Sequence, residues 1–308
     1  MKKVRQKVIV VLGQTATGKS DFAVRLAQTL GTTTTKYEII SADSRQVYTG
    51  LDLGTGKITK KEMKGVPHHL LDVISPKKVF SAATFKELGT EAIKEIALRG
   101  NTTIICGGTG FYIDTLLGSV SLPEVPQDEK LRARLEKLST EKLLAKLEKL
   151  DSTRAKTIDR NNRVRIIRAI EIATALGSVP VLKKKELSYD VFFIGLALPD
   201  EILRERIHVR LKKRIKIGMI EEAEQLHTQK LSWKRMRELG LEYKYLADFL
   251  TKKISKEEMI TLLEYAIWHY AKRQKTWFQR NKEIVWIDPR EESATKLVVE
   301  KVKDFIKE

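Results

Sequence analysis

The chain has 308 residues with a formal net charge of +18, and its 42% hydrophobic and 32% charged residues are typical of a soluble globular protein. No apolar run approaches the roughly 20 residues of a membrane helix, and one cysteine, Cys106, excludes both a disulfide framework and a Cys/His zinc site. We therefore expect a cytoplasmic protein without membrane contact. The positive excess favours a polyanionic partner, because lysines and arginines displace counterions from nucleic-acid phosphates, although a generally basic proteome would give the same excess.

The first predicted element is a strand over Val8–Leu12, an apolar run too short for a signal peptide. Directly after it, "GQTATGKS" completes the pattern G-x-x-x-x-G-K-[ST], and apolar residues then recur at helical spacing from Phe22 to Leu30. Strand, loop and helix in this order indicate a P-loop, whose backbone N–H groups cradle phosphates. The predicted phosphate-binding residues are Gly13, Gln14, Thr15, Ala16, Thr17, Gly18, Lys19 and Ser20. Lys19 adds a charge and the Ser20 hydroxyl can bind Mg²⁺, and such a loop binds a diphosphate as readily as a triphosphate.

Further short apolar runs predict the other strands of a sheet. They lie at 38–42, 102–108, 191–198 and 283–288, and polar or helical segments separate them. Strands that are apolar throughout and alternate with helices favour a parallel sheet covered on both faces. The predicted fold class is α/β, with a P-loop NTPase-like parallel sheet core and an inserted helical domain.

The inserted domain is predicted from residues 127–176, where leucines recur at helical intervals and no strand candidate appears. We expect a catalytic core formed by residues 1–119 and 189–308. Residues 120–188 would then be a helical insertion domain. Long helical segments follow in the second half of the core, at about 200–230 and 255–275, and an amphipathic helix ends the chain.

Two segments after predicted strands carry candidate site residues. "SADSRQVYTGLDLGTGK" (41–57) begins where a strand ends, which is where open α/β sheets bind ligands, so Asp43 is aimed at the site. Its carboxylate suits Mg²⁺ binding or a general base, and capping of the following turn is an equally good explanation. "GGTGFY" (107–112) follows another strand and offers the Thr109 hydroxyl, although a glycine turn alone is weak support.

The segment 200–215 stacks three arginines on one helix face. Arg206, Arg210 and Arg214 are spaced by four, and none has an acidic residue three or four positions away. Like charges at this spacing repel by roughly 0.2–0.5 kcal/mol each, and Arg210 has one on both sides. An anion from elsewhere in the protein or from a ligand would relieve this repulsion at Arg210. The alternative interpretation is that Arg210 is a solvated surface arginine.

A mixed aromatic and basic stretch, "WHYAKRQKTWFQR", spans residues 268–280. Aromatic rings stack on splayed bases and basic groups hold the backbone, so with the net charge we favour RNA binding over aromatics that simply fill the core. His68 and His69 have no metal-ligand spacing around them, and we expect structural roles for both.

Four segments in this order resemble the tRNA dimethylallyltransferases, a branch of the isopentenyltransferases. They are "GQTATGKS", "DSRQVYTGLDLGTGK", "VPHHLLDVISPKKVFSAATF" with "GGTGFY", and "AKRQKTWFQR". The resemblance runs from about residue 8 to about residue 288, and "NNRVRIIRAIE" resembles the family's arginine-rich insert helix. The absence of the C-terminal zinc finger that eukaryotic members often carry favours a bacterial type.

The resemblance implies transfer of a dimethylallyl group from dimethylallyl diphosphate to N6 of the adenosine 3′-adjacent to the anticodon (position 37) of tRNA. The P-loop would hold a prenyl diphosphate with Mg²⁺, despite the ATP-binding label that family descriptions often carry. Asp43 matches the family's general base, Arg210 its diphosphate-contacting arginine, and Thr109 a position close to the target adenosine. The implied tRNA-binding residues are Asp43, Ser44, Arg45, Gln46, Thr109, Arg165, Arg168, Lys272, Arg273, Gln274 and Trp277. The implied partner is the tRNA anticodon stem-loop, bound by a monomeric enzyme.

Two departures from the family pattern bear on the tRNA contacts. Gly240-Leu241-Glu242-Tyr243 stands where Gly-Tyr-Lys-Glu is usual, and Ile267-Trp268 replaces a usual Thr-Arg. Two alternative functions stay open from the sequence: a P-loop phosphotransferase such as a nucleotide-type kinase, and a non-catalytic RNA-binding protein with a vestigial P-loop. Intact Lys19, Ser20 and Asp43 count against the second alternative.

Overall fold

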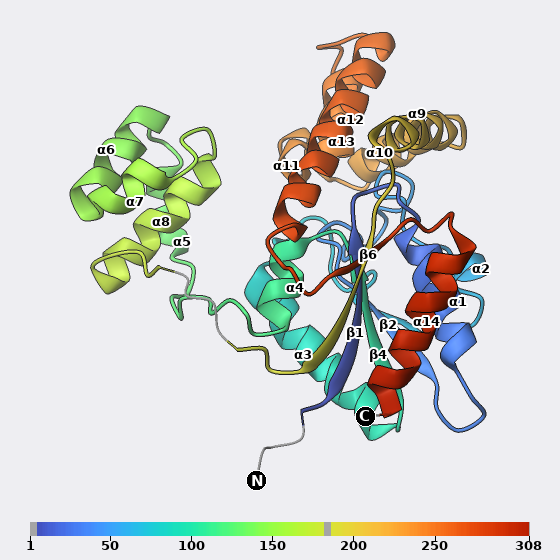
Figure 1. Ribbon diagram of the computed structural model, residues 1–308. Coiled ribbons are helices and arrows are strands. Elements are labelled where there is room, and N and C mark those ends of the chain that lie inside the picture. Colours follow the sequence, from blue (N-terminus) through green and yellow to red (C-terminus); the bar gives the residue numbers. More distant parts are fainter. Residues whose placement is uncertain (1–4, 182–185, 308) are drawn as a thin grey trace. The chain divides into compact units, whose positions relative to one another are not determined.

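The protein is described by a computed structural model in which residues 5–181 and 186–307 are placed (Figure 1). The chain forms two compact units, Met1–Ser119 with Glu186–Glu308, and Val120–Lys185. The first unit holds the sheet and the second is helical.

A parallel sheet organises the first unit. Within the described residues it has six strands in the order β3-β2-β4-β1-β5-β6, and every neighbouring pair is parallel. The strands are β1 (Lys7–Gly13), β2 (Tyr37–Ser41), β3 (His68–His69), β4 (Thr102–Gly107), β5 (Asp190–Leu196) and β6 (Val285–Ile287). The P-loop NTPase-like α/β fold is confirmed, and β3 is an edge strand that the sequence did not predict.

Helices cover both faces of this sheet, as the apolar strands required. Alternate residues of β1 enter separate cores, with Val8, Val10 and Leu12 in one and Ile9 and Val11 in the other. Helices α1 (Lys19–Leu30) and α14 (Glu292–Lys307) pack on one face, and α3 (Ala82–Leu98) and α4 (Gly110–Leu116) pack on the other. Figure 1 shows them on the two sides of the strands. This double burial explains why the strands lack a polar face.

The helices of the first unit continue beyond the sheet. They are α1 (Lys19–Leu30), α2 (Lys60–Met63), α3 (Ala82–Leu98), α4 (Gly110–Leu116), α9 (Asp200–Lys216), α10 (Met219–Thr228), α11 (Trp233–Leu239), α12 (Leu241–Leu250), α13 (Lys256–Phe278) and α14 (Glu292–Lys307). The predicted helical segment 200–230 is two helices, because the chain turns at Gly218 with φ 111°. Ser255 begins α13 with a capping box, in which its side chain accepts from the Glu258 N–H. None of the helices in the described ranges is both long and apolar enough to cross a membrane.

The second unit has a core of its own. Its helices are α5 (Glu129–Leu135), α6 (Thr140–Leu150), α7 (Ser152–Thr157) and α8 (Arg163–Leu176), with no strand among residues 120–181. Leu143, Leu147, Ile166 and Ile170 are fully buried at its centre. The leucine spacing therefore predicted the inner faces of α5 and α6, whereas isoleucines form the inner face of α8.

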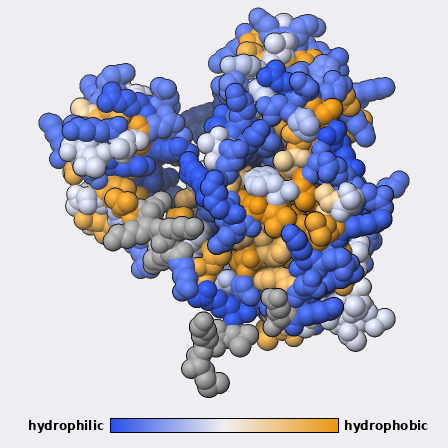
Figure 2. Space-filling view, in the orientation of Figure 1, coloured by the Kyte–Doolittle hydropathy of each residue, from blue (hydrophilic) through white to orange (hydrophobic). Residues whose placement is uncertain are grey.

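Hydrophilic side chains cover most of the face of the molecule shown in Figure 2. This agrees with the 32% of charged residues and the net charge of +18.

Candidate functional site

The loop between β1 and α1 has the backbone of a phosphate cradle. Gly13 has φ 142°, and a Cβ there would lie 2.4 Å from the carbonyl oxygen of Leu196 on the neighbouring strand. Gly18 has φ 94° directly before α1, and Ala16 also has a positive φ of 64°. These left-handed residues turn the chain sharply between strand and helix. The loop therefore presents backbone N–H groups and a helix N-terminus to one place.

Lys19 begins α1 and folds back over this loop. Its Nζ donates to the Gln14 carbonyl at 2.6 Å, and the Thr17 hydroxyl donates to the same oxygen at 2.8 Å. Enclosure of the ammonium group, opposed by Cys106 and Asp43 and reinforced by Arg210, lowers the pKa of Lys19 to about 8. An anion bound in the loop would favour the charged form of Lys19.

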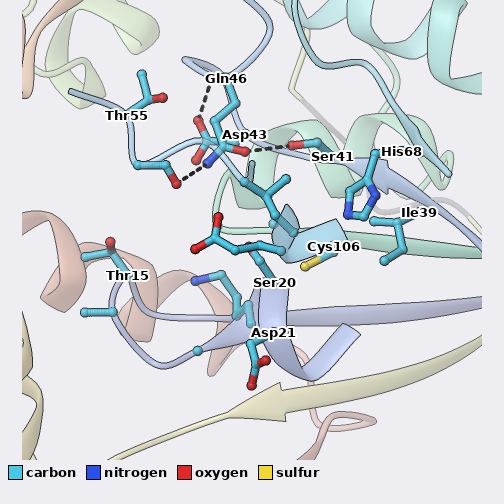
Figure 3. A pocket seen from close by; sticks show the side chains of 18 of the residues that line it. Thr15, Ser20, Asp21, Ile39, Ser41, Asp43, Gln46, Thr55, His68 and Cys106 are labelled. Carbon is cyan, nitrogen blue, oxygen red and sulfur yellow. Dashed lines mark hydrogen bonds between the residues drawn. The ribbon is translucent and has the colours of Figure 1, made fainter. Parts of the chain in front are cut away.

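A cavity of about 360 Å³ opens beside the P-loop (Figure 3). The P-loop, the ends of β2 and β4, the segment 55–68 and α9 all contribute to its wall. The residues that line it are Thr15, Ala16, Gly18, Lys19, Ser20, Asp21, Ile39, Ser41, Asp43, Gln46, Thr55, Gly56, Ile58, Glu62, Lys64, His68, Cys106, Gly107, Gly108 and Arg210. Five predicted phosphate-binding residues thus share one cavity with Asp43 and Arg210, whereas Thr109 is not among the lining residues. All of the cavity lies in the first unit.

Asp43 follows β2 and performs the capping role that the sequence left open. Its Oδ1 accepts from the N–H groups of Arg45 at 2.8 Å and Gln46 at 3.3 Å. No other hydrogen bond to this carboxylate is made by the described residues. Asp43 also lines the cavity, so the capping and site interpretations apply together.

Thr109 lies next to Asp43, because the turns after β2 and β4 are joined. The Thr109 hydroxyl oxygen accepts from the Ser44 N–H at 3.1 Å, and the Thr109 N–H donates to Ala42 O at 3.1 Å. The side chain of Tyr270, on α13, is hydrogen-bonded to Thr109. Burial raises the pKa of Tyr270 to about 12, and the charge of Asp43 adds to the shift, so this phenol stays protonated.

The three stacked arginines of α9 have different partners. Arg206 donates to Thr17 O at 3.5 Å, and Arg214 donates to Gly54 O at 2.8 Å. Among the described residues Arg210 makes no hydrogen bond or ion pair. A Cβ on Gly56 would lie 2.5 Å from its Nη2, so the guanidinium packs directly on the backbone that walls the cavity. Arg210 is therefore the cation of this row that is free to take an anion there.

The unusual Glu242 explains why Arg214 differs from Arg210. It forms an ion pair with Arg214 at 3.4 Å, with 12% and 11% of the two side chains exposed. Burial raises the pKa of Glu242, and Arg214 opposes that shift. Glu242 thus neutralises Arg214, one of the arginines beside the cavity.

Glu222 and Tyr243 hold the loop that carries the cavity wall, and the sequence did not reveal them. The Glu222 carboxylate accepts from the N–H groups of Asp52, Leu53 and Gly54 at 3.0, 2.6 and 2.9 Å. The Tyr243 hydroxyl donates to Glu222 at 2.7 Å. No local signal marks this contact, since Glu222 lies 168 to 170 residues from the loop in sequence.

The candidate tRNA-binding residues near the cavity and on α13 are only partly accessible. Ser44, Arg45 and Gln46 are half-buried, while Lys272 and Arg273 are exposed. Trp277 is half-buried, and its Nε1 donates to Asp114 Oδ2 at 3.0 Å.

Gln274 differs from its expected place among the tRNA-binding residues. It is 5% exposed, and both ends of its amide are hydrogen-bonded inside the protein. The amide therefore faces the protein interior and offers no free group to RNA.

The insert helix α8 separates its two candidate arginines. Arg165 is exposed, and no side-chain partner for it lies within the described ranges. Arg168 pairs with the buried Glu171 at 3.3 Å and donates to Val125 O at 2.6 Å. Arg132 also pairs with Glu171, at 2.7 Å. Arg168 therefore holds the helical unit together, and Arg165 is the one that is available to a partner.

A family model described as IPP transferase matches residues 46–281. This chain belongs to the IPP transferase family. The tRNA dimethylallyltransferase 2 of Treponema denticola is 46% identical over 278 residues, which cover 88% of this chain and 91% of the relative.

Solved structures of IPP transferase relatives extend the match over the P-loop and Asp43, which precede the region of the family model. The full-length tRNA isopentenylpyrophosphate transferase from Bacillus halodurans has a TM-score of 0.73 at 33% identity, over 98% of this chain and 97% of that chain. A eukaryotic dimethylallyltransferase, described as acting on tRNA, has a TM-score of 0.79 at 26% identity, over 98% of this chain and 80% of that one.

Proposed function

We propose that this IPP transferase moves a dimethylallyl group from dimethylallyl diphosphate to N6 of the adenosine 3′-adjacent to the anticodon in tRNA. The observation that carries the proposal is the shared cavity of Lys19, Arg210 and Asp43. Two cations that form no ion pair with the described residues suit a diphosphate leaving group, and a carboxylate beside them suits the proton of an attacking amine. A kinase would use the same loop, but the curated relatives are named as dimethylallyltransferases.

The diphosphate would be bound by the P-loop backbone together with Lys19 and Arg210. As the allylic C–O bond breaks, negative charge grows on the diphosphate, and preorganised cations stabilise that charge. Both cations line the cavity, and neither forms an ion pair with a residue that the structure describes; Asp43 and Glu62 are more distant carboxylates. Binding therefore needs no salt bridge to be broken.

Mg²⁺ fits the same end of the cavity. The Ser20 hydroxyl lines it in the first turn of α1, and the described part of the chain has no cluster of three or more His, Cys, Asp or Glu side chains that would form a separate metal site. Mg²⁺ is commonly held by one or two protein oxygens plus substrate phosphates, and when bound it would add positive charge on the leaving group.

Asp43 would accept the proton that the amine loses. The N6–C bond forms as the allylic C–O bond breaks, the electron pair of that bond leaves with the diphosphate, and one N6 proton passes to the carboxylate. The Oδ1 of Asp43 is held by two backbone N–H groups, which leaves its other oxygen for the proton. Thr109, fixed beside it by Ser44 and Tyr270, would contact the base.

The target adenine must leave its stack to reach this cavity. Extrusion of a base costs a few kcal/mol, and this cost is lowest in loops. An anticodon loop therefore fits as the acceptor. Exposed Lys272, Arg273 and Arg165 would bind its backbone, and the net charge of +18 would favour that binding. We assign this contact with tRNA to the helical insertion domain, residues 120–188. We also propose that the enzyme is a monomer in the cytoplasm, where tRNA is modified.

Nucleoside mass analysis tests this proposal. Unmodified tRNA is incubated with the protein, Mg²⁺ and dimethylallyl diphosphate, then digested, and the adenosine at position 37 is expected to gain one dimethylallyl group. Parallel reactions replace dimethylallyl diphosphate with ATP. Phosphate transfer from ATP to a small hydroxyl acceptor, with no prenylated nucleoside, would favour the kinase alternative instead.

A further inference from the structure

Gln274 is a buried amide in the last turns of α13, with 5% of its surface exposed. Its Oε1 accepts from the Thr15 N–H at 2.7 Å, and its Nε2 donates to Gly108 O at 2.9 Å. A Cβ on Gly108 would lie 2.2 Å from this Nε2, so the strand-end turn comes as close as a glycine allows. The two partners fix the orientation of the amide, because one is a donor and the other an acceptor.

These two hydrogen bonds join the two halves of the cavity. Thr15 belongs to the P-loop after β1, and Gly108 directly precedes Thr109, whose hydroxyl holds the Ser44 N–H beside Asp43. Glutamine is the neutral side chain that provides both an acceptor and a donor at this length. Asparagine is shorter, and a charged side chain provides only donors or only acceptors.

Two further side chains on the same face of α13 contact the segment that follows β4. Tyr270, four positions earlier, bonds Thr109, and Trp277, three positions later, bonds Asp114. Positions three and four apart lie on one helix face, so the three side chains form one row. Gln274 is the member of this row whose hydrogen bonds reach the P-loop.

We propose that Gln274 is a positioning residue that fixes the phosphate-binding loop relative to the corner formed by Asp43 and Thr109. The proposal rests on the proposed function, because the distance it fixes is the one between leaving group and proton acceptor. A misplacement of about 1 Å between reacting groups can lower a rate about 100-fold. This role differs from the direct tRNA contact that the sequence suggested for Gln274.

The variant Gln274→Glu tests the role through its pH dependence. Glutamate keeps the acceptor for Thr15 but loses the donor to Gly108 and sets a carboxylate against that carbonyl. Protonation restores the donor, and burial raises the pKa of the new carboxyl, with Lys19 and Arg210 of the adjoining cavity opposing that shift. We expect a single-turnover rate about 100-fold below wild type at about pH 9, with the ratio to wild type recovering at least about tenfold by about pH 6.

Two comparisons keep the test decisive. Gln225→Glu makes the same change at an exposed position of α10 and should match wild type throughout. Gln274→Met removes both hydrogen bonds at similar size, and its rate deficit should not recover at low pH. If Gln274→Glu shows no cooperative melting transition, it is not folded, and the rate of Gln274→Met then tests the role of Gln274. The tRNA Kd should stay within about twofold of wild type in every variant.

Three results would overturn the role of Gln274: a wild-type rate in Gln274→Glu, a deficit in that folded variant that does not change with pH, or a tRNA Kd that rises while the rate holds. Calorimetry with inorganic diphosphate separates this from the proposed function. We expect binding about tenfold weaker in Gln274→Glu at about pH 9, because the carboxylate repels the Gly108 carbonyl and the P-loop loses its fixed position. Failure of the wild type to prenylate tRNA would contradict the proposed function alone, and the diphosphate comparison would then decide for Gln274.

Discussion

The two carboxylate oxygens of Asp43 allow its structural and chemical roles to be separated. Oδ1 caps the turn through Arg45 and Gln46. Asp43→Asn keeps an acceptor for this turn but cannot take a proton, whereas Asp43→Ala loses both. We expect prenyl transfer in rapid-quench assays to fall about 10²–10⁴-fold in both variants. Chemical denaturation should show a free energy of unfolding lowered by about 1 kcal/mol in Asp43→Ala alone. An Asn variant with normal turnover would show that the proton leaves by another route.

Arg210 is expected to act on the diphosphate and not on tRNA. Removing a charged hydrogen-bond donor costs about 1.5–3 kcal/mol, so Arg210→Met should weaken binding of dimethylallyl diphosphate by about 10- to 150-fold. Lys212→Met is the matched control, because Lys212 is an exposed cation on the same helix. The KM for dimethylallyl diphosphate and the tRNA Kd are measured for both. Equal KM values in the two variants would contradict the assignment.

At the scale of elements, a network of ion pairs and hydrogen bonds around the buried Glu38 ties the edge of the sheet together. Glu38 of β2, with 4% of its side chain exposed, accepts from Arg99 at 2.9 Å, Asn101 at 2.7 Å and His69 of β3 at 2.7 Å. Burial alone would raise the pKa of Glu38, but these hydrogen bonds outweigh it and lower the pKa to about 2. This network is the structural role expected for His69.

This lowered pKa predicts an acid-sensitive sheet edge. Because the folded pKa lies below the unfolded one, near 4.5, the stabilisation is full above about pH 5 and is lost as the pH falls toward 2. It amounts to about 3 kcal/mol. The variant Glu38→Gln should flatten the unfolding free energy between about pH 5 and about pH 2.5 relative to wild type, as followed by urea titrations. Parallel pH curves for the two proteins would show that Glu38 does not carry the effect.

Within the helical unit, Arg165 and Arg168 are expected to differ. Arg165→Ala removes an exposed cation and should weaken tRNA binding with no change in melting temperature. Arg168→Ala breaks the pair with buried Glu171 and should lower the melting temperature. Loss of one partner of a buried ion pair costs about 3–5 kcal/mol, and the remaining Arg132 pair would reduce that cost. Filter binding and calorimetry check both, and equal tRNA affinities in Arg165→Ala and wild type would remove Arg165 from the interface.

The elements that could be predicted from sequence are those whose signal is local. Apolar runs located β1, β2, β4 and β5 within a residue or two, and leucine spacing located α5 and α6. The strand β3 has two residues and no apolar run, so it depends on pairing with β2. Likewise, the Glu222 and Gln274 contacts join residues more than 150 positions apart, which no local pattern records.

At the scale of the whole molecule, the P-loop motif predicted the geometry of the loop but not which phosphate compound the loop binds. Gly13, Lys19 and Ser20 lie where the motif predicts, and Asp43 and Arg210 come to the same cavity from β2 and α9. The same loop would bind either a diphosphate ester of an alcohol or a nucleoside triphosphate. Membership in the IPP transferase family favours the first, and the absence of a carboxylate partner for Arg210 in the described chain agrees with it.

The central claim is that this P-loop holds a leaving group and not a phosphate donor. The direct test is product stoichiometry in a reaction with unmodified tRNA, Mg²⁺ and dimethylallyl diphosphate but no nucleotide. The account predicts one inorganic diphosphate released for each prenylated adenosine, with both products abolished together in Lys19→Met. A reaction that requires ATP, or that releases monophosphate in place of diphosphate, would contradict it.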